Sequence, residues 1–202
     1  MRIGLLGPAD GDTEAAREAI EFLLGDVEVD QAIYLGDDRD ALESLLERWA
    51  EEVFGERHDN EAFLRRAAEV AEEGDPLAIE GLLHRDAWVR KLGRIRRLPA
   101  APARAIEMIA DRILIAVHDK SILDEEDIAN AQVIVYGRSD EAEIRRFGSR
   151  YFLTPGPLTA GRVVVLETEG AGEVAAALFE TTGIPVWRQT LARRTGKVSV
   201  VR

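Results

Sequence analysis

The sequence predicts an α/β fold. Three observations indicate it: apolar runs alternate with amphipathic segments in the first 55 residues, this alternation returns near residue 113, and the last third is rich in β-branched residues. Alternating strands and helices are typical of a parallel sheet with helices on its faces. The β-branched runs are separated by glycines, which indicates antiparallel strands joined as hairpins.

The expected elements begin with strands at Arg2–Leu6 and Gln31–Leu35. The segment between them carries apolar residues at helical spacing, and a second helix follows, in which Trp49 belongs to the apolar stripe. A helical insertion is expected at residues 60–98, which are rich in Ala, Glu, Leu and Arg. The remaining predicted elements are a short helix near Glu125–Ala129 and strands at Ile113–Val117, Val133–Tyr136, Val163–Leu166, Val186–Gln189 and Val198–Val201.

Length, composition and charge limit the classes of function. A chain of 202 residues with 46% apolar residues fits one globular domain spanning residues 1–202. The absence of cysteine excludes disulfides, Cys-ligated zinc, iron–sulfur clusters and a thiol nucleophile. The net charge of -12 disfavours nucleic acid as a partner. No apolar run resembles a signal peptide or a membrane span, so we expect a cytoplasmic protein without membrane insertion.

The charge is distributed unevenly along the chain. Residues 1–80 hold 23 acidic and 7 basic residues, and the rest of the chain holds 15 and 19. Six basic residues cluster within residues 85–97. Such a cluster indicates either a docking patch for an acidic partner or a solvated helix face. We take Trp88, Arg90 and Arg94 as the candidate partner-binding residues, and we expect their replacement by Ala to leave stability nearly unchanged. The clustered bases are Arg85, Arg90, Lys91, Arg94, Arg96 and Arg97.

Six short motifs stand in order at the expected ends of strands and in the segment after the second helix. Each contains a Gly, Pro or His, and the first five also carry acidic or basic residues that could face a common site. They are Gly7–Asp12, Gly36-Asp37, Glu56–Asp59, Val117–Asp119, Tyr136–Asp140 and Thr154–Pro157.

In order and spacing, these motifs resemble those of the calcineurin-like metallophosphoesterases, and the resemblance covers nearly the whole chain. It implies a β-sandwich flanked by helices. The small bacterial and archaeal phosphodiesterases are the most similar branch, and the chain is similar in size to the phosphoesterase-fold subunit of the retromer coat. In active members of the family, the motifs hold two metal ions that bind and activate a phosphate ester.

Most of the ligands that the resemblance implies are replaced here. Asp37, which bridges the two metals in active relatives, and His118 are kept. His58 matches the histidine that assists the leaving group, and it is the catalytic candidate if the protein is active. Pro8 and Asp10 stand where the family has Asp and His in its first motif.

The replacements decide which metals could bind. Asp10, Asp37 and Asp140 could hold one Mg²⁺ or Mn²⁺ weakly, because hard cations accept carboxylate oxygens. The second site would face Arg57 and Arg138, whose guanidinium groups cannot ligate a cation. We therefore expect no bound cofactor, with a single Mg²⁺ or Mn²⁺ as the alternative, and no two-metal hydrolysis.

Two interpretations of this vestigial pocket stay open. In the first, Asp37 pairs with Arg57 and Asp140 pairs with Arg138, so that salt bridges fill the space of the metals. In the second, the two guanidinium groups bind a phosphate or another anion, with the histidines of the third and fourth motifs as polar partners. The expected function is a non-catalytic adaptor or protein-binding scaffold. The alternatives are a divergent phosphoesterase that uses one metal or none, and an anion sensor.

Overall fold

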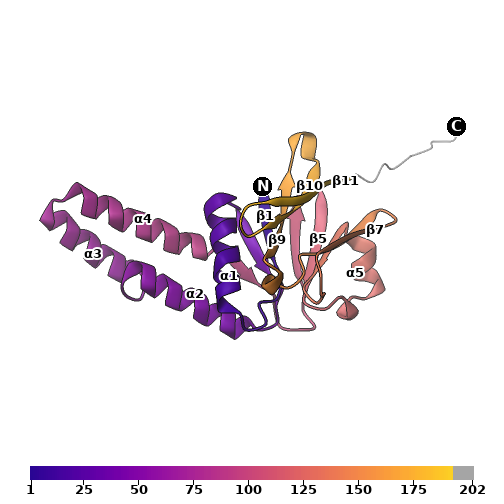
Figure 1. Cartoon of the computed structure of the whole chain (residues 1–202), viewed down its shortest axis with the longest axis horizontal. Coiled ribbons are helices and arrows are strands. Elements are labelled where there is room, and N and C mark those ends of the chain that lie inside the picture. The colour runs from indigo at the N-terminus through magenta and orange to yellow at the C-terminus, as the bar shows by residue number, and fades with distance from the viewer. Residues whose placement is uncertain (193–202) are drawn as a thin grey trace.

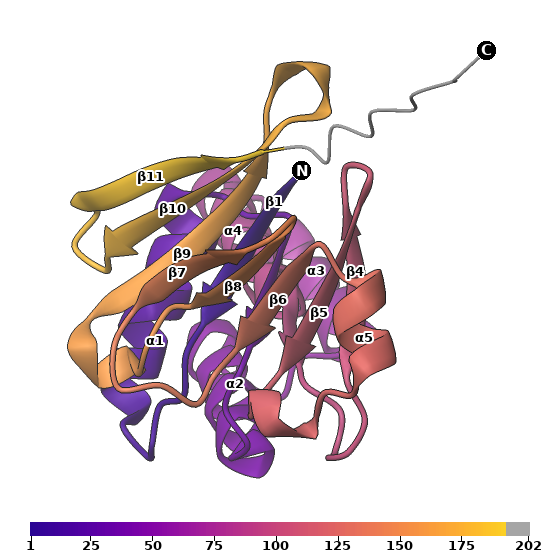
Figure 2. The same ribbon diagram turned by 90° about the vertical axis from the view of Figure 1, so that its right-hand side faces the viewer.

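The computed structural model describes residues 1–192, in which two stacked sheets carry helices on their outer faces and a helical arm projects to one side (Figures 1 and 2). Sheet A has the strand order β11-β10-β9-β1-β2-β3. β1 pairs parallel with β2 and antiparallel with β9, and β2 pairs parallel with β3. Its strands are β1 (Arg2–Leu6), β2 (Gln31–Tyr34), β3 (Ile95–Arg97), β9 (Arg162–Thr168), β10 (Val174–Glu180) and β11 (Pro185–Leu191).

Sheet B has the strand order β4-β5-β6-β8-β7. Its three central strands β5, β6 and β8 are parallel, and the edge strands β4 and β7 each pair antiparallel with a neighbour. The strands are β4 (Ala105–Ile109), β5 (Arg112–Val117), β6 (Val133–Tyr136), β7 (Glu143–Phe147) and β8 (Arg150–Thr154).

Helices cover both outer faces of the sandwich. α1 (Thr13–Glu21) begins at Asp12, whose carboxylate accepts a hydrogen bond from the backbone N–H of Ala15, and continues into a π-helical turn, η1 (Phe22–Asp26). α2 (Arg39–Phe54) follows β2, and α5 (Glu125–Asn130) covers sheet B. Residues 1–192 also contain three 3-10 turns: η2 (Lys120–Ile122), η3 (Leu158–Ala160) and η4 (Gly170–Gly172).

The side chains of β1 alternate between two separate hydrophobic cores. Ile3 and Leu5 are fully buried between the two sheets, whereas Leu6 packs under the helices of sheet A together with Ile20 and Trp49. Successive side chains of a strand point to opposite faces, so one short strand contributes to both layers. A strand that is apolar on both faces is typical of a parallel sheet covered on each side.

Glycines of the first, fifth and sixth motifs lie where backbone segments touch. A Cβ on Gly7 would lie 1.7 Å from the carbonyl oxygen of Gly156, and a Cβ on Gly137 would lie 2.2 Å from that of Leu35. Heavy atoms cannot approach so closely, so these positions admit only glycine. The glycine frame of the motifs is therefore required by the packing of the loops, with or without a metal.

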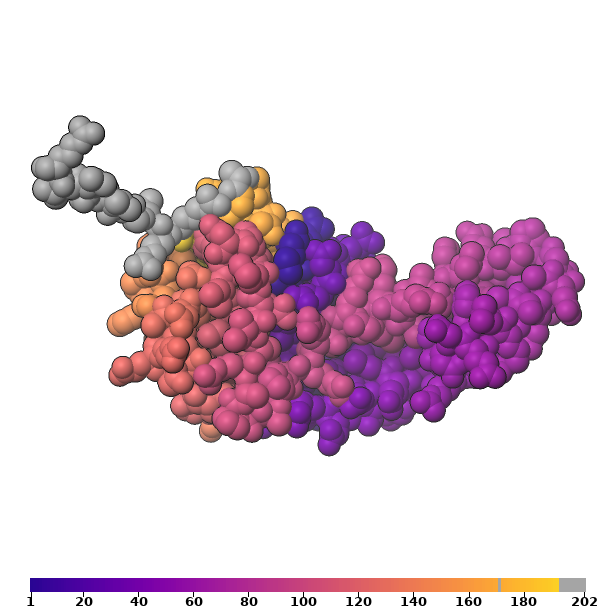
Figure 3. Space-filling model, turned by 180° about the vertical axis from the view of Figure 1, so that it is seen from behind, coloured from indigo at the N-terminus to yellow at the C-terminus, as the bar shows by residue number. Residues whose placement is uncertain are grey.

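The arm contains α3 (Asn60–Glu73), which continues outward from the end of α2, and α4 (Pro76–Leu92), which runs back antiparallel along α3 and the outer part of α2 (Figures 1 and 3). A small core of its own holds the helices together through Phe54, Ala62, Leu82 and Val89. The expected insertion at residues 60–98 is thus helical for most of its length. Its last residues differ, because Ile95–Arg97 form β3 and extend sheet A beside β2.

The predicted fold class is confirmed, since the structure is a sandwich of two sheets flanked by helices. The strands expected in the last third are present at β9 and β11, and the predicted strand Val198–Val201 lies outside the described residues. β4, β7, β8 and β10 were not predicted. Ala105–Ile109 and Glu143–Phe147 are short edge strands with exposed side chains, and Val174–Glu180 is rich in alanine. Within residues 1–192, no helix combines the length and apolar character needed to span a membrane.

Candidate functional site

The candidate site lies where the carboxyl ends of parallel strands from both sheets meet. The loops after β1 and β2 belong to sheet A, and those after β5 and β6 belong to sheet B. Hydrogen bonds fix the loops: the N–H of Leu35 donates to Leu6 O (2.8 Å), and the N–H of Gly137 donates to Val117 O (3.1 Å) and His118 O (3.0 Å). Ligands bind at such strand ends in many α/β proteins.

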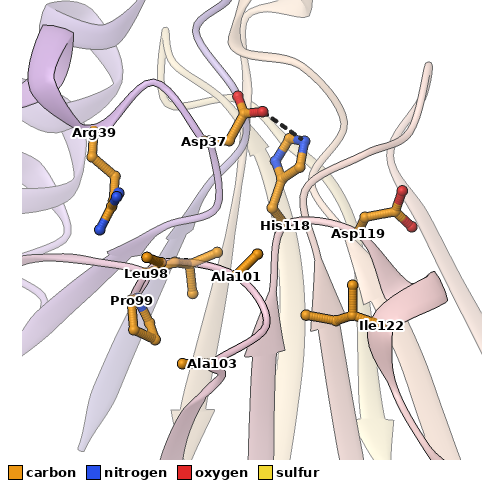
Figure 4. Close-up of a pocket in the computed structure, with 11 residues that line it drawn as sticks. Asp37, Arg39, Leu98, Pro99, Ala101, Ala103, His118, Asp119 and Ile122 are labelled. Carbon is orange, nitrogen blue, oxygen red and sulfur yellow. Dashed lines mark ion pairs between the residues drawn. The ribbon is translucent and has the colours of Figure 1, made fainter.

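Asp37 and His118 are two candidate metal ligands that the structure brings together (Figure 4). Nε2 of His118 lies 3.7 Å from Oδ2 of Asp37, while Nδ1 lies 2.9 Å from the carbonyl oxygen of Leu35. A carbonyl only accepts hydrogen bonds, so Nδ1 carries the proton and Nε2 is the nitrogen directed toward Asp37. The side chain of Asp37 is 78% exposed, so this is a solvated pair.

Arg138 pairs with Asp119 and not with Asp140. Nη1 of Arg138 lies 2.8 Å from Oδ2 of Asp119, and the expected pairing with the exposed Asp140 is therefore wrong. The carboxylate of Asp119 also accepts the backbone N–H of Ser121 at the start of η2 (2.8 Å). These two contacts, the backbone hydrogen bond first, lower the pKa of Asp119 to about 2.

Arg57 and His58 are outside the candidate site. They follow α2, whose 16 residues lead from the strand ends into the arm, and a helix of this length spans about 24 Å. The expected salt bridge between Asp37 and Arg57 is therefore wrong, and the anion site built on Arg57 and Arg138 is not assembled. Arg57 is exposed at the junction of α2 and α3, beside Asp59.

His58 instead joins a polar cluster inside the arm. Its Nε2 lies 2.8 Å from Oδ1 of Asp86 on α4, and Oδ2 of Asp86 accepts a 2.7 Å hydrogen bond from Nε of Arg90. The imidazole also packs edge-on against the ring of Phe54, with centroids 4.7 Å apart. Burial acts against the ionised form of Asp86, but its hydrogen bonds with Arg90 and His58 outweigh that effect and lower its pKa. His58 therefore connects the helices of the arm.

A pocket of about 190 Å³ lies beside Asp37 and His118 (Figure 4). Arg39, at the start of α2, reaches its edge, and Asp119 lines the opposite side. Drug-sized ligand pockets usually have volumes of about 300–1,000 Å³, so this one holds at most a small ion or group. One wall is apolar and comes from the segment between β3 and β4: Leu98, Pro99, Ala100, Ala101 and Ala103.

Tyr34 is a site residue that the motifs did not reveal. Its side chain is buried under the loops after β1 and β2, where its hydroxyl accepts the N–H of Ala9 (2.8 Å) and donates to Oδ1 of Asp38 (2.5 Å). Burial is the main cause that raises the pKa of Tyr34, so the phenol stays neutral. Asp10, on the same loop, is exposed and has a positive φ of 51°.

The available donors do not fit the two-metal centre of active relatives. Among residues 1–192, no three His, Asp or Glu side chains lie together in an arrangement that could hold a metal ion. Asp37 and His118 alone are too few ligands for a tetrahedral or octahedral site held by the protein. The set Asp10, Asp37 and Asp140 follows three different strand ends and does not converge.

The candidate partner-binding residues lie at the root of the arm. Trp88 packs edge-on against Trp49 of α2, with ring centroids 5.8 Å apart, and contacts the core under sheet A. Nη1 of Arg94 donates to the carbonyl oxygen of Val29 (3.1 Å), while Arg90 binds Asp86. Trp88 and Arg94 thus join the arm to the body, whereas Arg90 binds Asp86 within α4 and lies over the ring of Phe63 on α3, 5.8 Å from its centroid.

Solved structures similar to this chain are phosphoesterase-fold proteins. A predicted phosphoesterase from Streptococcus pneumoniae has a TM-score of 0.52 at 13% identity, covering 95% of this chain and 97% of its own. Vps29 from Chaetomium thermophilum has a TM-score of 0.56 at 11% identity, with both chains covered completely. Vps29 from Entamoeba histolytica, complexed with Zn²⁺, has 0.52 at 12%, covering 95% and 100%.

No protein-family model matches the sequence, and no curated protein matches it by sequence. At 10–17% identity, the similar structures show the fold alone. The two sheets flanked by helices agree with that likeness. The chain therefore has the calcineurin-like metallophosphoesterase fold.

Proposed function

We propose that this protein is a non-catalytic, protein-binding scaffold built on the metallophosphoesterase fold. The observation that carries the proposal is the composition of the strand-end site: Asp37 and His118 face each other, but no third donor in the described part of the chain joins them. Hydrolysis by the usual route needs paired metals that activate a water and stabilise the leaving oxygen. A fold that keeps its packing while losing this donor set is suited to recognition.

The arm is the element through which we propose that the scaffold binds. It projects from the body (Figure 3), and Leu64, Ile79 and Leu83 on its helices are 66%, 39% and 52% exposed. Exposed apolar side chains that gather on one element are typical of interaction surfaces. The proposed localisation is cytoplasmic, and nucleic acid is not a proposed partner because of the net charge of -12.

A divergent phosphoesterase is the second candidate, favoured by the orientation of His118. Its Nδ1 is fixed by Leu35 O, which leaves Nε2 facing Asp37 at the mouth of the pocket. Such an imidazole could act as a general acid or base or as one ligand of a weakly bound cation. His58 is not part of this candidate, because it binds Asp86 in the arm.

Turnover of generic substrates separates the two candidates. With Mn²⁺ added, the protein should hydrolyse p-nitrophenyl phosphate and bis(p-nitrophenyl) phosphate no faster than its His118→Ala variant, since no paired-metal site is available to either. His58→Ala is a matched control that removes a histidine of the arm. Turnover that His118→Ala abolishes and His58→Ala retains would contradict the scaffold and support the divergent phosphoesterase.

A further inference from the structure

The outer helices of the arm carry two exposed apolar stripes. On α3 the stripe is Leu64, Ala68 and Ala71, and on α4 it is Ile79, Leu83 and Ala87. The spacings i, i+4, i+7 and i, i+4, i+8 place the members of each stripe on one side of their helix. All six residues are exposed, and Leu64, Ile79 and Leu83 are 66%, 39% and 52% accessible.

Both stripes lie on the same face of the arm. Every residue of the two stripes comes directly after a residue that faces the inside of the arm. On α3 these inner residues are Phe63, Ala67 and Val70, which belong to the core of the arm; on α4 they are Leu82, which also belongs to it, and the less exposed Ala78 and Asp86. One residue is a rotation of about 100° around a helix. Because α3 and α4 run antiparallel, this same offset turns both stripes toward one side. We call the six residues the arm face.

Charge is separated along the length of the arm. From residue 67 to residue 84 there is no Lys or Arg, and the exposed acids of the tip include Glu72, Glu73 and Glu80. Toward the root, α4 carries Arg85, Arg90 and Lys91, and Arg90, whose side chain is 56% exposed, lies on the side of the arm face, seven residues after Leu83. The arm face is therefore flanked by acidic residues at the tip and by basic residues at the root end of α4.

We propose that the arm face binds the arm face of a second copy of this chain, with the two arms antiparallel around a two-fold axis near Leu83. In this arrangement the acidic tip of each arm lies beside the basic root of the other. A two-fold interface uses the same patch on both subunits, so it needs a patch that is complementary to its own rotated copy. The lengthwise charge separation and the central apolar stripes meet this requirement.

The residue types suit close packing of helices. Ala68, Ala71 and Ala87 are small and let helix backbones approach, while Leu64 and Leu83 supply apolar area that is now in water. Trp88, Arg90 and Arg94 remain free for their contacts within one subunit. The inference rests on the proposed scaffold function in one respect, that the arm is its binding element.

The mass in solution tests the proposal. We expect light scattering behind a sizing column to give twice the chain mass of 22.3 kDa at micromolar concentrations. The double variant Leu64→Gln, Leu83→Gln should weaken the dimer at least about tenfold, which corresponds to about 1.4 kcal/mol. The matched control is Leu77→Gln, because Leu77 is 75% exposed but lies on another side of α4, two residues before Ile79.

A charge exchange tests the antiparallel arrangement itself. The tip variant Glu72→Lys, Glu73→Lys, Glu80→Lys and the root variant His84→Glu, Arg85→Glu should each be monomeric, because like charges then meet at both ends. Their mixture should restore a dimer, since each reversed tip finds a reversed root. A wild-type monomer, a dimer equally affected by Leu77→Gln, or a mixture that stays monomeric would overturn the proposal. Metal content and turnover test the scaffold function separately, because neither depends on the arm.

Discussion

Replacing Gly7 by Ala is expected to destabilise the protein by at least about 3 kcal/mol. The new Cβ would lie 1.7 Å from the carbonyl oxygen of Gly156, a backbone atom that cannot move without shifting the loop after β8. For a chain of this size, that change corresponds to a melting temperature lower by roughly 6–12 °C. Thermal unfolding followed by circular dichroism measures it.

Gly170→Ala is the control for this substitution. No heavy atom lies within 4 Å of the position that its Cβ would take, so its melting temperature should stay close to that of the wild type. Equal melting temperatures for the two variants would show that the loops do not depend on the close contact at Gly7. The motif glycines would then need another explanation.

The triple substitution of Trp88, Arg90 and Arg94 by Ala should cost about 3–5 kcal/mol of stability. Trp88 would leave a void beside Trp49, Asp86 would lose its guanidinium partner, and Val29 O would lose a donor. The sequence predicted the opposite: that the three residues lie on the surface and that replacing them by Ala leaves the stability nearly unchanged. Chemical denaturation measures the free energy of unfolding directly.

Leu77→Ala is the matched control on α4, since Leu77 is 75% exposed near the tip and its loss should change stability by less than about 0.5 kcal/mol. If the triple variant unfolded at the same denaturant concentration as this control, the root of the arm would be a free surface. The docking role first assigned to Trp88 would then be open again.

The sequence was sufficient to predict the layers of the fold, because β1 and β2 carry unbroken apolar runs between amphipathic helices. The sequence alone could not show that the third motif lies in the arm, away from the strand-end site. Asp59 is the N-cap of α3, where its carboxylate accepts the N–H of Ala62 at 2.8 Å, and His58 precedes it at a helix junction. A His-Asp pair at a helix start thus resembles a catalytic motif, although capping explains the Asp.

The side-chain pairings across the strand ends also could not be predicted from the sequence. Asp119 caps η2 and forms the ion pair with Arg138 that was expected of Asp140. Tyr34 is buried under the loops after β1 and β2 and connects them through its hydroxyl. These pairings depend on loop conformations a few residues long, which residue patterns do not specify. The organisation as a single domain over residues 1–202 remains a prediction.

Metal stoichiometry is the measurement that tests the central claim most directly. After purification and dialysis against Mn²⁺ or Zn²⁺, elemental analysis should find no stoichiometric transition metal, because within residues 1–192 Asp37 and His118 have no third donor beside them. His118→Ala should then give the same content as the wild type. Two metal ions per chain, lost in the His118→Ala variant, would contradict the account and show that the strand-end site still assembles a metallophosphoesterase centre.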